Sequence, residues 1–197
     1  MLRIVLSLAA LLTLAACGAD NKWASDEAVA KARYVDDGPP TLTLFTVLSN
    51  RSDAGAHLGL MISGSQRIMF DAAGSFYHPN IPERADVLYG FTPAVVDFYI
   101  DYHARVTYRV VKQDLQVSPE VAEQAIRLVE AYGAVPKAFC TKAITDVLRQ
   151  LPGFESMPST FYPKKAMEAF GRMPGVTTEV FYDDDPDKNG YILTRGI

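Results

Sequence analysis

The fold is decided by residues 57–72, which read HLGLMISGSQRIMFDA. Two apolar runs, 57–63 and 67–71, have the composition of strands, and the short GSQ segment between them suits a turn. This pattern predicts an antiparallel hairpin. If the hairpin closes around Gly64 and Ser65, His57 and Asp71 lie near each other at its open end.

Outside this hairpin, helices and strands interleave along the chain. We expect strands at 41–49, 108–115 and 177–182, helices at 92–105, 118–132, 140–151 and 163–170, and a long loop over 74–89. Branched residues on both faces of 41–49 predict a central strand. Because the order lacks a regular βαβ rhythm and the hairpin is antiparallel, we predict the α+β class, with a small antiparallel sheet packed against helices.

The N-terminus has the pattern of an exported chain. Residues 1–16 combine one early positive charge with an apolar run, which predicts a signal peptide that is too short to span a bilayer comfortably. Residues 14–17, LAAC, resemble the lipobox of bacterial lipoproteins. This resemblance implies cleavage before Cys17, which then carries diacylglycerol and fatty acids such as palmitate, and so anchors the protein to a membrane. Gly18 in place of an aspartate implies the outer membrane, facing the periplasm.

Composition limits what the mature chain can be. Removing 16 of the 197 residues leaves 181, enough for one domain over 41–182. The formal charge of −4 argues against a nucleic-acid partner. Residues 17–40 are expected to tether lipid to domain, with Trp23 and Tyr34 docking part of the segment. Residues 183–197 are expected to be a solvated acidic tail; it matches the start of a calcium-binding EF-hand loop but has Gly196 at the twelfth position.

Cys140 is the thiol expected to stay free, because the acylated Cys17 cannot pair with it. It begins a predicted helix, where the helix dipole and the nearby Lys142 favour the nucleophilic thiolate. The alternative is a buried cysteine that packs as a small apolar side chain beside Ile144 and Leu148. We favour the nucleophile.

His57 is the candidate base for Cys140, and Asp71 is the candidate third residue that would orient the imidazole. The ordinary alternatives are a strand histidine with a structural partner and an aspartate that caps a turn. His78 is expected at a loop surface, and His103 near the C-terminal dipole of its helix. A metal site is not expected, since the sequence has no paired-ligand spacing, and no cofactor is predicted.

Together these residues resemble the NlpC/P60-type, papain-like cysteine hydrolases. The resemblance lies in the His-strand-turn-strand-polar residue hairpin of 57–72 and in a cysteine that starts a helix. Cys140 follows His57 by 83 residues, which resembles the circularly permuted branch of the family. The family implies a thiol hydrolase or acyltransferase with Cys140, His57 and Asp71 as catalytic residues, acting on peptide or amide bonds of the cell wall or on an acyl group.

The alternative function is a non-catalytic lipoprotein that uses the same papain-like shell for binding or envelope assembly. Its contact surface would be the aromatic-rich loop over 76–89, since aromatic residues are enriched at interfaces. The sequence does not choose an oligomeric state or a protein partner.

Overall fold

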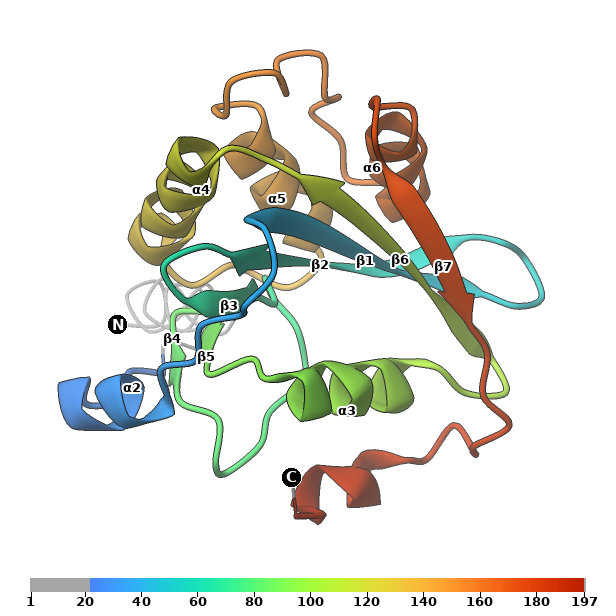
Figure 1. Ribbon diagram of the computed structural model, residues 1–197. Helices are drawn as coiled ribbons and strands as arrows, with labels where there is room; N and C mark the ends of the chain where they lie inside the picture. The colour runs from blue at the N-terminus through green and yellow to red at the C-terminus, as the bar shows by residue number, and fades with distance from the viewer. Residues whose placement is uncertain (1–21, 197) are drawn as a thin grey trace, which may run out of the picture.

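Figure 1 presents the computed structural model, which describes residues 22–196. The predicted signal peptide and Cys17 lie outside the described residues. In the described part of the chain, no helix combines the length and apolar character needed to cross a bilayer.

The described residues form one antiparallel sheet covered by helices. This arrangement confirms the predicted α+β class. The seven strands lie in the order β4-β5-β3-β2-β1-β6-β7. Their bounds are β1 Thr41–Ser49, β2 Gly55–Ser63, β3 Arg67–Phe70, β4 Glu83–Arg84, β5 Val87–Tyr89, β6 Tyr108–Gln116 and β7 Thr177–Phe181. β1 is central, as predicted, and β2 and β3 form the predicted hairpin with Leu60 opposite Phe70.

Both faces of the sheet are covered, so the central strands are buried on both sides (Figure 1). One face packs against α4 (Pro119–Tyr132), α5 (Cys140–Leu148) and α6 (Pro163–Gly171), and the other against α3 (Pro93–His103). The period-2 alternation of strands sends Leu44 and Phe45 to opposite faces. This three-layer arrangement explains why β1 is apolar on both faces.

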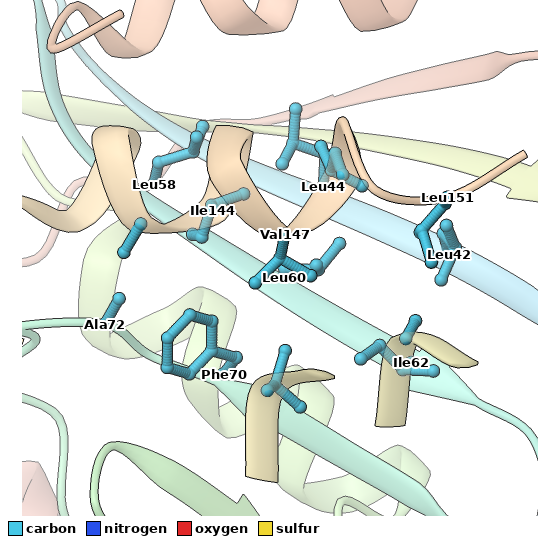
Figure 2. Packing of buried hydrophobic residues seen from close by; sticks show 14 of the residues in the cluster. Leu42, Leu44, Leu58, Leu60, Ile62, Phe70, Ala72, Ile144, Val147 and Leu151 are labelled. Atoms are coloured by element: carbon cyan, nitrogen blue, oxygen red, sulfur yellow. The ribbon is translucent and has the colours of Figure 1, made fainter. Parts of the chain in front are cut away.

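Helix α5 is held firmly over β2. Ile144 and Val147 are fully buried and lie against Leu58 and Leu60 (Figure 2). Full burial of such a side chain contributes about 1.5–3 kcal/mol. The position of the helix, and therefore of Cys140 at its first residue, is fixed by this packing.

The two predicted proline-led helices begin with side-chain caps. Thr92 accepts a hydrogen bond from the Val95 N–H at 3.3 Å, and Ser118 accepts one from the Val121 N–H at 3.4 Å. A hydroxyl at this position satisfies one of the N–H groups that the first helical turn leaves without a partner. The starts of α3 and α4 therefore follow from local sequence.

Three segments are more ordered than the sequence suggested. The expected loop at 74–89 contains β4 and β5, and the expected tether contains helix α2, Asp26–Ala32. The expected solvated tail instead forms the 3-10 helix η2, Gly190–Thr194, and buries Ile192 against the α3 layer. These short elements are held by tertiary contacts, which local patterns do not encode.

Candidate functional site

An unpaired stretch of β2 edge lies where the hairpin opens. Pairing between β2 and β3 begins at Leu60 and Phe70, so His57 and Leu58 have no partner on β3, although both pair with β1 on their other side. The first residue of α5, Cys140, reaches this edge. The His57 side chain and the Leu58 backbone N–H lie close enough to the sulfur to lower its pKa, and the sulfur lies 3.8 Å from the Thr141 hydroxyl oxygen.

His57 joins the sulfur to a buried carboxylate. Its Nε2 lies 2.7 Å from Asp71 Oδ1. A carboxylate only accepts hydrogen bonds, so Nε2 carries the proton and Nδ1 is left to face Cys140. Cys140, His57 and Asp71, the three predicted site residues, therefore lie together, with the imidazole of His57 between the sulfur and the carboxylate.

The charges of these groups reinforce one another. Burial opposes the charged form of His57, but the Asp71 carboxylate and the hydrogen bonds to Asp71 and Cys140 outweigh it and raise its pKa to about 10. Burial also opposes ionisation of Asp71 and Cys140, yet the imidazolium and its hydrogen bonds hold the pKa of each below its ordinary value. The site therefore favours a thiolate–imidazolium pair.

Lys142 does not take part in this charge pair. It forms an ion pair with Asp146, one helical turn further along α5. The prediction that the Lys142 charge favours the Cys140 thiolate is wrong, because Lys142 pairs with Asp146 and the charge that lowers the Cys140 pKa is that of His57.

Tyr99 is a member of the site that sequence reasoning missed. Its hydroxyl donates a 2.7 Å hydrogen bond to Asp71 Oδ1, the same oxygen that accepts from His57. The phenol reaches Asp71 from α3 only because residue 59 is glycine: a Cβ there would lie 2.6 Å from the Tyr99 oxygen. Tyr99 therefore holds the carboxylate in place from beneath the sheet.

His103 lies one turn beyond Tyr99 and stacks on His57. The two rings are nearly parallel, at 9°, with centroids 5.6 Å apart. His103 Nδ1 lies 2.9 Å from the Tyr99 carbonyl oxygen, which agrees with the expected contact at a helix C-terminus. Burial lowers the pKa of His103 to about 4, so a neutral ring faces the His57 imidazolium. Tyr99 and His103 are four residues apart, a spacing that places two side chains on the same face of a helix, and this spacing could have indicated from the sequence that they belong to one site.

The second oxygen of Asp71 is enclosed by the turn that follows β3. Oδ2 is buried without a hydrogen-bond partner among the described residues. A Cβ on Gly74 would lie 1.7 Å from this oxygen, so only glycine fits beside it. The Gly74 N–H also donates to the Asp71 backbone carbonyl at 2.8 Å, so the backbone of Asp71 closes the turn, while its side chain bonds to His57 and Tyr99 instead of capping it. The residue thus closes a turn and orients His57.

Asp86 connects the two loops that carry the site. Its Oδ2 accepts hydrogen bonds from the Ala73 N–H at 2.8 Å and from the Val135 N–H at 2.9 Å. Ala73 follows Asp71, and Val135 lies in the segment that leads into α5. The Asp86 carboxylate, in the turn between β4 and β5, therefore holds the loop after Asp71 and the segment before Cys140 at a fixed separation.

Cys140 is nearly buried, and the aromatic residue that precedes it in the chain is exposed. Cys140 is 8% exposed and the His57 side chain 15%. Phe139 and Phe161 are both largely exposed and meet edge to face, with centroids 5.2 Å apart. A groove of about 810 Å³ lies elsewhere, between α3 and the β1-β6-β7 side of the sheet, and none of the three site residues lines it.

The remaining candidates lie away from the sulfur. His78 is buried, contrary to the expected surface position, and its Nε2 lies 2.7 Å from the Arg195 carbonyl oxygen. Phe76 and Tyr89 of the aromatic-rich segment are buried as well, so most of the expected contact surface faces the core.

The tail that resembles an EF-hand start uses its oxygens for other contacts. Asp187 accepts from the Thr107 hydroxyl at 2.5 Å, and the Asn189 side-chain oxygen accepts from Arg105 at 3.1 Å. Asn189 also donates to the Tyr102 carbonyl oxygen at 2.9 Å. These contacts attach the tail to the region after α3.

One group of side chains has the residue types of a metal site. His57, Asp71 and His103 each offer a ligand atom, and these atoms lie within 4.8 Å of one another. However, Asp71 Oδ1 already accepts hydrogen bonds from His57 and Tyr99. The contacts among these residues fit a hydrogen-bond network that positions His57.

Comparison of the chain with known protein families, with curated proteins and with solved structures finds no match.

Proposed function

We propose that this protein is a lipid-anchored cysteine hydrolase or acyltransferase of the cell envelope, with a permuted papain-like domain. The observation that carries the proposal is the 2.7 Å contact between His57 and Asp71, together with a Cys140 close enough for the imidazole and the sulfur to shift each other's pKa. A nucleophile, a base and an orienting group in this order form the common arrangement of covalent catalysis at a carbonyl.

The reaction follows from the charges of the site. The Cys140 thiolate attacks the substrate carbonyl carbon, a C–S bond forms, and the carbonyl electron pair moves to oxygen. The N–H groups at the start of α5, including that of Cys140, would hold this oxyanion. His57 then donates its proton to the leaving group. Water or an acceptor alcohol or amine, deprotonated by His57, attacks the acyl-enzyme and releases the thiolate.

Two substrate classes suit this chemistry in the proposed compartment. A peptide or amide bond of the cell wall is the first, because the proposed anchor at Cys17 holds the enzyme beside the wall. A lipid or thioester acyl group is the second, and the exposed Phe139–Phe161 pair beside the nucleophile supports it, since an acyl chain gains free energy by covering apolar rings.

A non-catalytic binding role is the competing function. It is favoured by the low exposure of the Cys140 residue, 8%, which leaves little room for a substrate carbonyl without local movement. In that case the charge pair would contribute to stability alone, as a buried ion pair with hydrogen bonds.

Product formation by the purified mature protein separates the two functions. We would incubate it with muropeptides and with an acyl thioester, and follow the released amine or thiol. We expect product from one substrate class, loss of product in Cys140→Ala, and little change in Lys142→Ala, whose side chain pairs with Asp146. No product from either class, together with a Cys140 that iodoacetamide does not label, would reject the enzyme.

The proposed anchor has its own test. Globomycin blocks the peptidase that cleaves lipoprotein signal peptides, so treated cells are expected to accumulate the uncleaved chain. Unchanged processing in the presence of globomycin would contradict lipidation at Cys17.

A further inference from the structure

The chain is attached to the domain from Lys22 onward. The Ala24 N–H donates to the Glu83 carbonyl oxygen at 2.9 Å, and the Ala85 N–H donates to the Lys22 carbonyl oxygen at 3.1 Å. Arg84 Nε also donates to the Ala24 carbonyl oxygen at 2.8 Å. Within the described residues, the proposed tether is therefore attached to the β4 edge of the sheet at its first residue, well before residue 40.

This attachment leaves a short connection to the lipid. Cys17 precedes Lys22 by five residues, so even a fully extended chain spans only about 18 Å. A domain of this size has a radius of gyration of about 16 Å and is wider than that connection. The β4 edge must therefore stay close to the bilayer, while β7 at the opposite edge points away from it (Figure 1).

The surface at this edge has the residue types of a membrane interface. Trp23 is 66% exposed and Tyr77 48%. The Arg84 guanidinium lies over the Trp23 ring at 5.2 Å, and the Lys22 ammonium over the Tyr77 ring at 5.7 Å. Tryptophan and tyrosine favour the headgroup layer because each combines an apolar ring with a polar group.

The charges of this surface nearly balance. Lys22 pairs with Glu83 at 2.9 Å, and Arg84 pairs with Asp26 at 2.6 Å. Attraction to anionic lipid is therefore a minor contribution, and the exposed rings are the main groups that gain from contact with a bilayer. A hollow of about 360 Å³, lined in part by Trp23 and Tyr77, leaves room for a headgroup between the rings.

We propose that the Trp23 surface, formed by Lys22, Trp23, Tyr77 and Arg84, lies in the headgroup layer of a phospholipid bilayer. The inference rests on the lipid anchor of the proposed function and goes beyond it, because it fixes which side of the domain faces the membrane. The short connection from Cys17 brings the rings to the bilayer, and the rings then hold the domain against it.

Tryptophan fluorescence tests the orientation directly, since Trp23 is the single tryptophan of the sequence. The lipidated mature protein would be inserted into phosphatidylcholine vesicles, with or without bromine on the upper part of the acyl chains. Bromine quenches only at near-contact distance. We expect a blue-shifted emission and loss of most of the Trp23 signal in the brominated vesicles.

Two variants make the test specific. Tyr77→Ser removes one ring of the Trp23 surface and is expected to weaken the quenching. Tyr182→Ser removes an exposed ring that follows β7, at the other edge of the sheet, and is expected to leave it unchanged.

Mass spectrometry of the same sample shows whether Cys17 carries diacylglycerol, and so distinguishes failure of the proposed surface from failure of the proposed anchor. A lipidated chain whose Trp23 emission matches a solvent-exposed indole and is not quenched overturns the proposed surface alone. A mature chain without diacylglycerol on Cys17 overturns the anchor, and the proposed surface with it.

Discussion

Replacing Asp71 with asparagine is the sharpest perturbation of the site, because it removes the charge behind His57 and keeps the shape of the side chain. An amide oxygen can still accept the hydrogen bond from Tyr99. Without the carboxylate, burial dominates and the pKa of His57 falls below its ordinary value. A neutral imidazole no longer stabilises the thiolate, so we expect the Cys140 pKa to rise.

Removal of the Asp71 charge deprives His57 of an attraction of several kcal/mol. Opposite charges 2.7 Å apart attract by about 6 kcal/mol at an effective dielectric constant of 20. The rise of the His57 pKa from 6.5 to about 10, about 5 kcal/mol at 1.36 kcal/mol per unit, is the net result of the Asp71 and Cys140 interactions and the opposing cost of burial. An unperturbed thiol is only about 3% thiolate at pH 7. Because a more basic thiolate is intrinsically more nucleophilic, which offsets much of the lost thiolate fraction, we expect a net fall of about threefold in alkylation rate at pH 7.

The assay is the rate of Cys140 alkylation by iodoacetamide, followed by mass spectrometry between pH 5 and 10. In the unaltered protein the rate should level off below the pH at which an ordinary thiol ionises, and in Asp71→Asn the inflection should move upward. Asp114→Asn, which removes a carboxylate paired with Lys112 on β6, is the matched control. If the alkylation rates of Asp71→Asn and the unaltered chain had the same pH dependence, the Asp71 charge would not lower the Cys140 pKa through His57.

Three further outcomes are expected. Tyr99→Phe removes the hydroxyl bonded to Asp71 and should lower the free energy of unfolding by about 1 kcal/mol in urea titrations; an unchanged midpoint would contradict the bond. Gly74→Ala places a Cβ against the Asp71 carboxylate and should cost about 1–3 kcal/mol and slow alkylation, whereas Gly190→Ala, with open space around it, should not. Because folding raises the His57 pKa, its contribution to stability is complete below pH 6.5 and is lost as pH rises through about 10. In Cys140→Ala, which lacks the contribution of the thiol to this pKa, the loss should set in at a lower pH; a free energy of unfolding that does not change with pH would exclude it.

Local signals in the sequence explain what could be predicted. The β2–β3 hairpin follows from alternating apolar residues around a glycine turn, and α3 and α4 follow from their capping hydroxyls. The proximity of His57 and Asp71 could be inferred because hairpin pairing alone brings the two ends together. The approach of Cys140 required the family resemblance, because no local pattern states where α5 packs.

Contacts between distant segments explain what was missed. Tyr99 reaches Asp71 only because α3 lies under β2 and Gly59 leaves space for the phenol. Asp86 belongs to a turn between two very short strands, which sequence patterns do not distinguish from a loop. The docking of Ile192 likewise depends on a surface built by residues far away in the chain. Such features depend on tertiary packing, which overrides weak local preference.

The position of Cys140 on a helix separate from the hairpin has a consequence for the order of assembly. His57 and Asp71 are 14 residues apart, so they meet early, while contacts between segments 83 residues apart form later. Until α5 docks, the thiol lacks the imidazolium and the Leu58 N–H, and it keeps an ordinary pKa. If the chain folds only after export to the proposed envelope location, it therefore meets an oxidising compartment with a protonated, slowly reacting thiol. Its reactivity begins only when the domain is complete.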